Sequence, residues 1–309
     1  MQNAISKDQN TPRQLERLAA QRYLYSMAKR FLIVQLFLDL VSPIALAVLV
    51  ALFPGFGIYG ALIALLILVS GFYLESLQSS RREQAAGVQE LFDCELLDMQ
   101  CPDLIARNTP DTIEIMRAAE KYKRSDPTYA ALRNWYPSEV DTLPMYLARL
   151  VCQRLNCLWD VQLRRKYLQL VGITFFLLCV IVLMIALVKG LTVGNLLLGV
   201  IAPLLPAIGW IVREYRRQNE AIRRKETLQQ YAEELWNDAI KKRVPVEEIA
   251  YKSRGLQDQI YNNRCNNPLI LDAFYKRLQP KNEAQMNRSA KELADEALQS
   301  LGKKNDPLV

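Results

Sequence analysis

The 309-residue sequence contains no histidine. This absence excludes Ser-His-Asp and Cys-His nucleophiles, His-ligated zinc or haem, a phosphohistidine relay and an imidazole pH switch. A Gly-rich phosphate loop, a nucleophile elbow, a paired-carboxylate signature and a CxxC pair are also missing. The sequence therefore predicts a protein that is not an enzyme and that needs no cofactor and no metal.

Sustained β alternation and Gly/Ser-rich or Pro-rich linkers are likewise missing, whereas apolar residues make up 51% of the chain. The mean hydropathy of −0.01 averages a charged population with four apolar runs. Each run has the roughly 20 residues that cross about 30 Å of hydrocarbon. The short breaks at residues 54–55 and 189–190 join the runs in pairs, which cover residues 31–53, 56–77, 168–188 and 191–212. The sequence thus predicts an all-α integral membrane protein whose four transmembrane helices form two hairpins.

The remaining segments are rich in helical patterns, and we expect them to form one helical cytosolic domain. Thr11-Pro12 and Thr109-Pro110 are typical helix starts, the second for a helix that ends near Lys123. Spans two, three and four continue into polar helical patterns without a break. The predicted organisation is an N-terminal amphipathic helix (1–30), a first transmembrane hairpin (31–77), a cytosolic segment (78–167), a second hairpin (168–212) and a final cytosolic segment (213–309).

Basic residues flank the four runs on one side only, and they give the orientation. The flanking groups lie at residues 29–30, 81–82, 164–166 and 213–217, whereas Lys189 alone lies in a turn on the other side. By the positive-inside rule, both termini and the central loop are cytoplasmic in a multi-pass protein. Reduced cysteines follow from this location, and we interpret Cys152 and Cys157 as small packing residues.

Polar residues inside the predicted spans have two interpretations. Gln35, Asp39 and Ser42 fall on one helix face, where they either line a water-filled path or hold neighbouring helices together. Asn195 and Pro203 mark a similar stripe in the fourth span, which indicates either a hinge or ordinary close packing. Four helices cannot surround a wide lumen, so any pore requires a homo-oligomer.

Arginines recur among aromatic residues in the cytosolic segments. Guanidinium groups suit phosphates and aromatic faces suit bases, so such a set could bind a small nucleotide. Alternatively, these arginines pair with nearby acids or contact lipid headgroups. If Arg264 is a ligand residue, its replacement by alanine should weaken binding and leave the fold intact. The candidate ligand-binding residues are Trp135, Tyr136, Arg149, Arg154, Arg254, Tyr261 and Arg264.

Three segments carry a family resemblance: LERLAAQRYLYSMAK (15–29), YPSEVDTLPMYLARLVCQRLNCLWDVQLRRKY (136–167) and GLQDQIYNNR (255–264). With the two hairpins, they resemble the SMODS-associating four-transmembrane effectors, the predicted pore-forming effectors of bacterial CBASS antiphage operons. The resemblance implies that a cognate nucleotidyltransferase makes a cyclic di- or trinucleotide. The cytosolic part binds it, and the protomers then oligomerise or rearrange and permeabilise the inner membrane.

The implied partners are therefore the cyclic nucleotide, the lipid bilayer and further copies of the chain, and not a DNA or RNA polymer. A function of a different class stays open beside this one. In that alternative, the chain is a structural or adaptor membrane protein whose cytosolic helical bundle recruits a protein partner.

Overall fold

The computed structural model describes residues 3–42, 45, 57–103, 109–188 and 202–302. These residues form helices and loops without a strand, which confirms the all-α prediction. The elements in chain order are α1 (Ile5–Asp8), α2 (Pro12–Leu36), the π-helical turn η1 (Phe37–Val41), α4 (Gly57–Leu96), α6 (Thr112–Lys123), the 3₁₀ turns η3 (Ala130–Leu132) and η4 (Ser138–Thr142), α7 (Met145–Val188), α9 (Ala202–Ile240), α10 (Val246–Asn266) and α11 (Asp272–Gly302).

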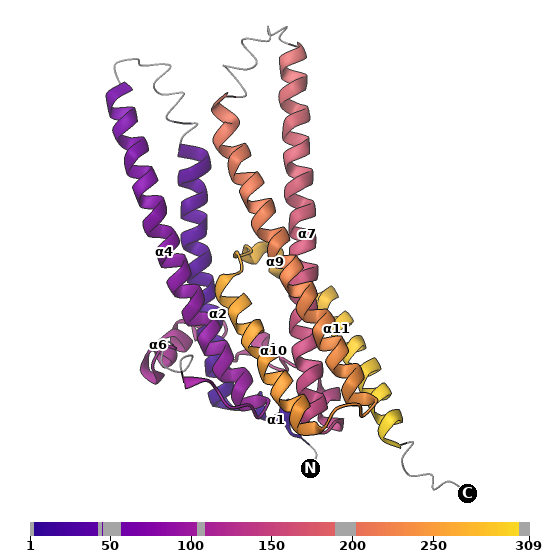
Figure 1. Ribbon diagram of the computed structural model, residues 1–309. Helices are drawn as coiled ribbons and strands as arrows, with labels where there is room; N and C mark the ends of the chain where they lie inside the picture. Colours follow the sequence, from indigo (N-terminus) through magenta and orange to yellow (C-terminus); the bar gives the residue numbers. More distant parts are fainter. Residues whose placement is uncertain (1–2, 43–44, 46–56, 104–108, 189–201, 303–309) are drawn as a thin grey trace, which may run out of the picture.

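Four long helices set the shape of the molecule. Figure 1 shows α2 beside α4 and α7 beside α9, two pairs that rise from a shared lower bundle and separate toward their distal ends. Helices α4, α7 and α9 are each continuous, as predicted, from the lower bundle into the apolar runs. The end of the first predicted span and both predicted turns lie outside the described residues.

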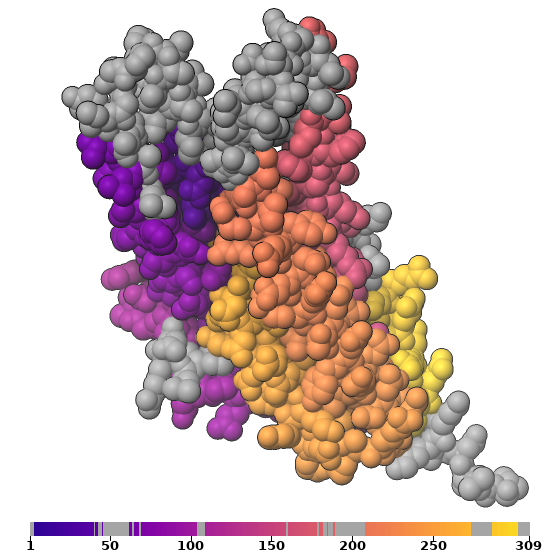
Figure 2. Space-filling model, turned by 45° about the horizontal axis from the view of Figure 1, so that its top comes forward, coloured from indigo at the N-terminus to yellow at the C-terminus, as the bar shows by residue number. Residues whose placement is uncertain are grey.

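The lower bundle contains the hydrophobic core. Helices α1, α6, α10 and α11 lie around the lower parts of the four long helices, and α9 and α10 cover the face shown in Figure 2. The core combines Leu18 of α2, Phe92 of α4, Leu147 of α7, Trp236 of α9 and Ile249 of α10, all buried. Because each segment outside the apolar runs contributes to one core, the bundle is not a separable domain.

The start of α6 differs from the prediction. The sequence placed this start at Thr109-Pro110, but α6 begins at Thr112, and Asp111 is its N-cap. The Asp111 carboxylate accepts a hydrogen bond of 2.7 Å from the backbone N–H of Glu114, which satisfies one of the free donors of the first turn. The predicted end at Lys123 is confirmed.

The six cysteines are all free thiols. Cys152 and Cys157 are completely buried on α7, where Cys152 belongs to the main core and Cys157 packs against Ala232 and Leu256. Their interpretation as small packing residues is confirmed.

The distal parts of the long helices expose large apolar side chains. Within the residues that the structure describes, no helix has a stretch both long enough and apolar enough to cross a membrane. Exposed apolar side chains nevertheless follow one another along all four helices. They include Ile33, Val34 and Phe37 near the end of α2, Leu65, Leu66, Val69 and Phe72 on α4, Ile173, Phe176, Leu177, Ile181 and Met184 on α7, and Val212 on α9.

Candidate functional site

A cavity of about 530 Å³ lies where the helices of the lower bundle meet. Its volume is within the range of about 300–1,000 Å³ that is typical of small-molecule sites. Helices α2, α4, α7, α9, α10 and α11 all contribute to its lining, together with the loop from residue 130 to 137 and the α10–α11 connection. Each of the four long helices therefore has residues in the wall of this cavity.

The cavity is strongly cationic. Among the described residues of the lining, Asp160 is the one acidic residue, against seven cationic residues. Oxygen-rich anions such as phosphates match this composition, because guanidinium and ammonium groups donate charge-assisted hydrogen bonds to them. The cationic residues are Arg22, Lys29, Arg82, Arg133, Arg164, Lys225 and Arg264.

Arg82 and Lys29 come from the α2/α4 pair and are held in different ways. The Arg82 guanidinium donates hydrogen bonds to the backbone carbonyls of Cys265 and Asn267. These acceptors are neutral, so the bonds fix the guanidinium without cancelling its charge. The Lys29 ammonium instead pairs with Asp272 at the start of α11. Both contacts connect the α2/α4 pair to the C-terminal part of the chain.

Asp160 organises a second group of polar side chains in the cavity wall. One oxygen, Oδ2, lies 3.0 Å from Arg164 Nε and 3.9 Å from Lys225 Nζ, and it accepts a 3.3 Å hydrogen bond from Asn267 Nδ2. Burial opposes the ionisation of Asp160, but Arg164 and Lys225 hold the pKa of this carboxyl below its ordinary value. The carboxylate thus stays charged and fixes three surrounding donors.

Trp135 and Tyr136 supply an aromatic wall between η3 and η4. Trp135 is partly buried, whereas Tyr136 is almost completely buried and stacks on Phe92 with a ring-centroid distance of 6.3 Å. The Tyr136 hydroxyl donates to Asp93 over 2.8 Å and accepts from Asn156 Nδ2 over 2.8 Å. Flat aromatic surfaces beside cationic groups are what stacked nucleobases require.

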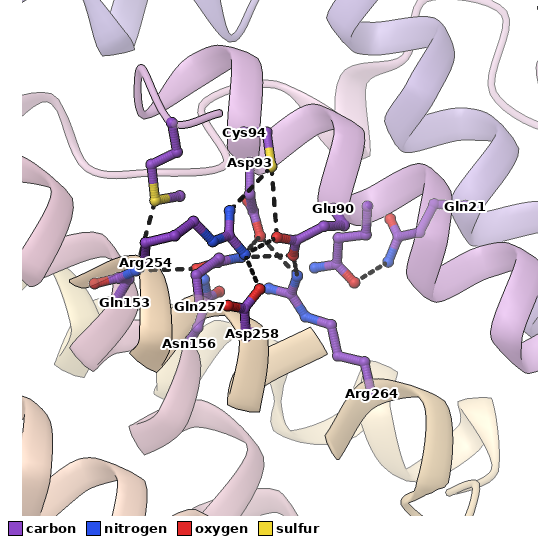
Figure 3. Close-up of polar contacts among 12 residues, drawn as sticks. Gln21, Glu90, Asp93, Cys94, Gln153, Asn156, Arg254, Gln257, Asp258 and Arg264 are labelled. Atoms are coloured by element: carbon purple, nitrogen blue, oxygen red, sulfur yellow. Dashed lines mark hydrogen bonds and ion pairs between the residues drawn. The ribbon is translucent and has the colours of Figure 1, made fainter. Parts of the chain in front are cut away.

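Behind the cavity lies a buried charge network between α4 and α10 (Figure 3). Glu90 and Asp93 of α4 have fully buried side chains. Arg254 Nη2 lies 2.7 Å from Glu90 Oε1, and Arg264 Nη1 lies 2.7 Å from Asp93 Oδ2. Gln257 donates to both carboxylates, over 2.8 and 3.1 Å. Arg254 Nη2 also lies 2.9 Å from Asp258 Oδ1, so two guanidinium groups face three carboxylates in this network.

Arg264 belongs both to the network and to the cavity wall. Its Nη1 pairs with Asp93, whereas its buried Nη2 has no hydrogen-bond partner in the described part of the chain. Burial disfavours the charge, but Asp93 and Glu90 raise the pKa of the Arg264 guanidinium above its ordinary value. Arg264 therefore adds to the cavity wall a charged group that also holds α4 and α10 together.

The structure divides the predicted ligand-binding residues. Trp135, Tyr136 and Arg264 line the cavity, whereas the other four do not. Tyr261, which is partly buried on α10, is among these four. The other three are arginines.

Each of these three arginines has a structural partner, which agrees with the alternative that such arginines pair locally. Arg149 donates to the backbone carbonyls of residues 97 and 98, over 2.9 and 2.6 Å. Arg154 lies 3.7 Å from Glu233. Arg254 pairs with Glu90 within the buried network. Sequence spacing could not separate these partners from a ligand, because the acids come from distant helices.

The polar residues of the first predicted span lie near the end of α2. Gln35 accepts a 2.6 Å hydrogen bond from Gln78 Nε2, which joins α2 to α4. Asp39 lies in the π-helical turn η1, and the Ser42 hydroxyl donates to the backbone carbonyl five residues earlier. For Gln35, the structure thus agrees with the interpretation that these polar residues hold neighbouring helices together.

Asn195 and Pro203 belong to the polar and small-residue stripe of the fourth predicted span. Asn195 lies outside the described residues. Pro203 lies on α9, next to Ala202, the first described residue of that helix. The hinge and close-packing interpretations of this stripe therefore stay predictions.

Several cavity residues had no ligand-binding role in the sequence analysis. Lys29, Arg82 and Arg164 stood out only as basic residues that flank apolar runs, and this same position brings them together where the lower bundle meets the apolar runs. Lys225 and Asn267 had no distinguishing signal, because their role depends on how α9 and the α10–α11 connection pack against Asp160.

Two cavity lysines lead to a prediction of pH dependence. Burial lowers the pKa of Lys29 and of Lys225, although Asp272 and Asp160 oppose the shift. Both ammonium groups therefore lose their protons below the ordinary lysine pKa of about 10.4. As pH rises through the window below that value, calorimetry should show falling affinity for the anion tripolyphosphate, because the cavity loses charge.

The free energy of unfolding should instead increase as pH rises. In the same window the folded protein binds fewer protons than the unfolded chain, so its stability rises with pH. The double replacement Lys29→Arg, Lys225→Arg keeps both charges over this range and should flatten both curves. If the double variant shows the same pH dependence as the wild type, other groups cause it.

Comparison with known proteins places this geometry in context. The model of the SMODS-associating 4TM effector domain matches residues 3–293, nearly the whole chain. A probable CBASS effector molecule from Bacillus cereus (strain VD146) is 26% identical over 290 residues, which cover 90% of this chain and 94% of the relative. No solved structure matches the chain.

Proposed function

This chain belongs to the SMODS-associating 4TM effector domain family, and we propose that it is a CBASS antiphage effector that binds a cyclic oligonucleotide and then permeabilises the bacterial inner membrane. The observation that carries the proposal is the cationic cavity in the lower bundle. It has seven cationic residues and an aromatic wall in a space of about 530 Å³. The similarity to a probable CBASS effector molecule supports the antiphage role.

The cavity favours a compact ligand with several phosphates. Its cations come from five helices and from the loop between η3 and η4, so a single terminal phosphate could reach only part of them. A cyclic di- or trinucleotide carries phosphates around a ring and bases at its edge, which matches a cationic cavity with Trp135 and Tyr136 in its wall. A partly enclosed cavity of this size is too small for a DNA or RNA polymer. We infer that a cognate nucleotidyltransferase supplies the ligand.

The exposed apolar side chains support membrane insertion of the distal helices. Contiguous exposed apolar surface marks contact with lipid or protein, because water does not solvate it well. In the proposed arrangement the distal parts of α2, α4, α7 and α9 form two transmembrane hairpins, and the basic residues at 81–82 and 213–217 lie at the cytoplasmic interface. The lower bundle, with α1 and the end of α11, then lies in the cytoplasm with both termini.

The cavity is placed so that ligand binding could move the helices. Its wall includes residues of both helix pairs, and the exposed ion pair Arg217–Glu75, at 2.9 Å, also connects α9 to α4. Since α4, α7 and α9 are continuous, displacement of their lower parts would be transmitted to their distal ends. We propose that ligand binding reorients the α2/α4 pair relative to the α7/α9 pair and that several protomers together form the lesion. Gln35, Asp39 and Ser42 are then candidates for its polar lining.

Membrane potential in bacterial cells provides the test. Cells that express this chain together with its cognate nucleotidyltransferase should lose membrane potential and stop growing when the synthase is active. A synthase variant without activity is the matched control. Undisturbed potential with high intracellular ligand would contradict the proposal. Stable co-purification of a protein partner in those same cells would favour the adaptor alternative.

A further inference from the structure

The cavity wall contains two buried hydrogen-bond acceptors that require a donor, which an ionised phosphate does not provide. Asn267 Oδ1 and Gln21 Oε1 have no hydrogen-bond partner among the residues that the structure describes. Both residues line the cavity and are deeply buried, with 4% and 6% of their surface exposed. Buried acceptors normally have partners, because leaving one unpaired costs free energy.

The orientation of the Asn267 side chain is fixed by its neighbour. Its Nδ2 donates to Asp160 Oδ2 over 3.3 Å, and a charged carboxylate accepts but does not donate. The opposite amide orientation would place two acceptor oxygens against each other. Arg164 and Lys225 hold Asp160 in place. The carbonyl oxygen of Asn267 is therefore the atom left without a partner.

Gln21 provides the second acceptor from another element. It lies on α2, and its Nε2 donates to Gln89 Oε1 of α4 over 3.1 Å, which leaves Oε1 unpaired (Figure 3). The two acceptors thus belong to α2 and to the α10–α11 connection. These elements come from opposite ends of the chain, and the cavity brings them together.

Phosphate oxygens only accept hydrogen bonds at neutral pH, so they satisfy the cations of the cavity and not these two carbonyl oxygens. The missing partners are N–H or O–H donors, which bases and ribose supply. We propose that Asn267 and Gln21 accept hydrogen bonds from the nucleoside part of the ligand, and so select a nucleotide over a bare polyphosphate. This inference rests on the proposed function, because it adds nucleoside recognition to the same cavity.

Calorimetry on the full chain in lipid nanodiscs tests the proposal. A panel of cyclic di- and trinucleotides that carry the four RNA bases identifies the tightest ligand, and tripolyphosphate serves as the base-free anion. Asn267→Ala should weaken binding of that nucleotide about tenfold, the value for one lost buried hydrogen bond, and should leave the affinity for tripolyphosphate unchanged. The matched control is Asn266→Ala, because Asn266 is exposed and does not line the cavity.

A change on the ligand side makes the test independent of any folding defect. The affinity of wild-type protein is measured for two analogues of the nucleotide that binds most tightly. One analogue lacks the base amino or imino hydrogens, and the other lacks the 2′-hydroxyls. Weaker binding of the first analogue identifies the base as the donor, and weaker binding of the second identifies the ribose. If both analogues bind as tightly as the parent, the inference is wrong.

The remaining outcomes separate this inference from the proposed function. Equal loss of nucleotide and tripolyphosphate affinity in Asn267→Ala would overturn nucleoside recognition, because it would show a general effect on the cavity. Unchanged nucleotide affinity in that variant would also overturn it and would leave the proposed function standing. If wild-type protein binds no member of the panel, the proposed function itself fails, and nucleoside recognition fails with it.

Discussion

Replacing Arg264 by methionine is expected to lower the free energy of unfolding by about 3–5 kcal/mol, the range for breaking a buried ion pair from one side. Asp93 and Glu90 have fully buried side chains, and Arg264 lies 2.7 Å from the first and 3.7 Å from the second. Without the guanidinium, Asp93 would lose the cation it pairs with, and Glu90 would keep only Arg254, which also pairs with Asp258. The unfolding midpoint in detergent should fall by about 10 °C.

Two controls define this result. Arg288→Met removes an exposed ion pair with Glu292 on α11 and should change the stability by no more than about 1 kcal/mol. The second replacement Asp93→Asn in the Arg264→Met background should restore part of the loss, because it removes one unpaired charge. Equal stability of Arg264→Met and Arg288→Met would show that the network does not hold α4 and α10 together. The sequence-based expectation that Arg264 could be replaced with the fold intact is revised for this reason.

Reversing the charge at Arg133 should have the largest effect on ligand binding with the least effect on the fold. Arg133 is exposed, lines the cavity and has no ion-pair partner among the described residues. Arg133→Glu replaces an attraction to phosphate by a repulsion. Charge-assisted hydrogen bonds contribute about 1.5–3 kcal/mol, so affinity for the cyclic oligonucleotide should fall about 10- to 100-fold or more.

Arg117→Glu is the matched charge reversal for this test. Arg117 is exposed on α6 and lies outside the cavity lining, so its reversal changes the net charge equally without touching the site. Calorimetry at two salt concentrations should show normal affinity for Arg117→Glu and a loss for Arg133→Glu that is larger at low salt. The same reduction in both variants would point to the general charge of the surface and not to the cavity.

The helical fold was predictable because its signals are local. Continuous 3.6-residue patterns predicted that α4, α7 and α9 run unbroken from the lower bundle into the apolar runs, and the structure confirms this. The start of α6 was less predictable. Thr109-Pro110 has the sequence of a helix start, but the hydrogen bond from Glu114 N–H makes Asp111, two residues later, the N-cap.

The candidate ligand site was only partly predictable, because its residues come from sequence-distant helices. Aromatic and arginine composition identified Trp135, Tyr136 and Arg264. The same composition also selected Arg149 and Arg154, whose partners are a pair of backbone carbonyls and Glu233. Whether an arginine faces a cavity or an acid depends on packing between helices, which a single sequence does not specify.

Dye release from liposomes tests most directly whether occupation of the cavity by a cyclic oligonucleotide opens the membrane. The full chain is reconstituted in vesicles of phosphatidylethanolamine and phosphatidylglycerol that contain a fluorescent dye, and the cyclic oligonucleotide that binds in calorimetry is added. If the proposed function is right, the dye is released rapidly and only when the ligand is present. The Arg133→Glu variant should release no dye at the same ligand concentration. Intact vesicles at a ligand concentration that saturates the wild-type protein would contradict the proposed function.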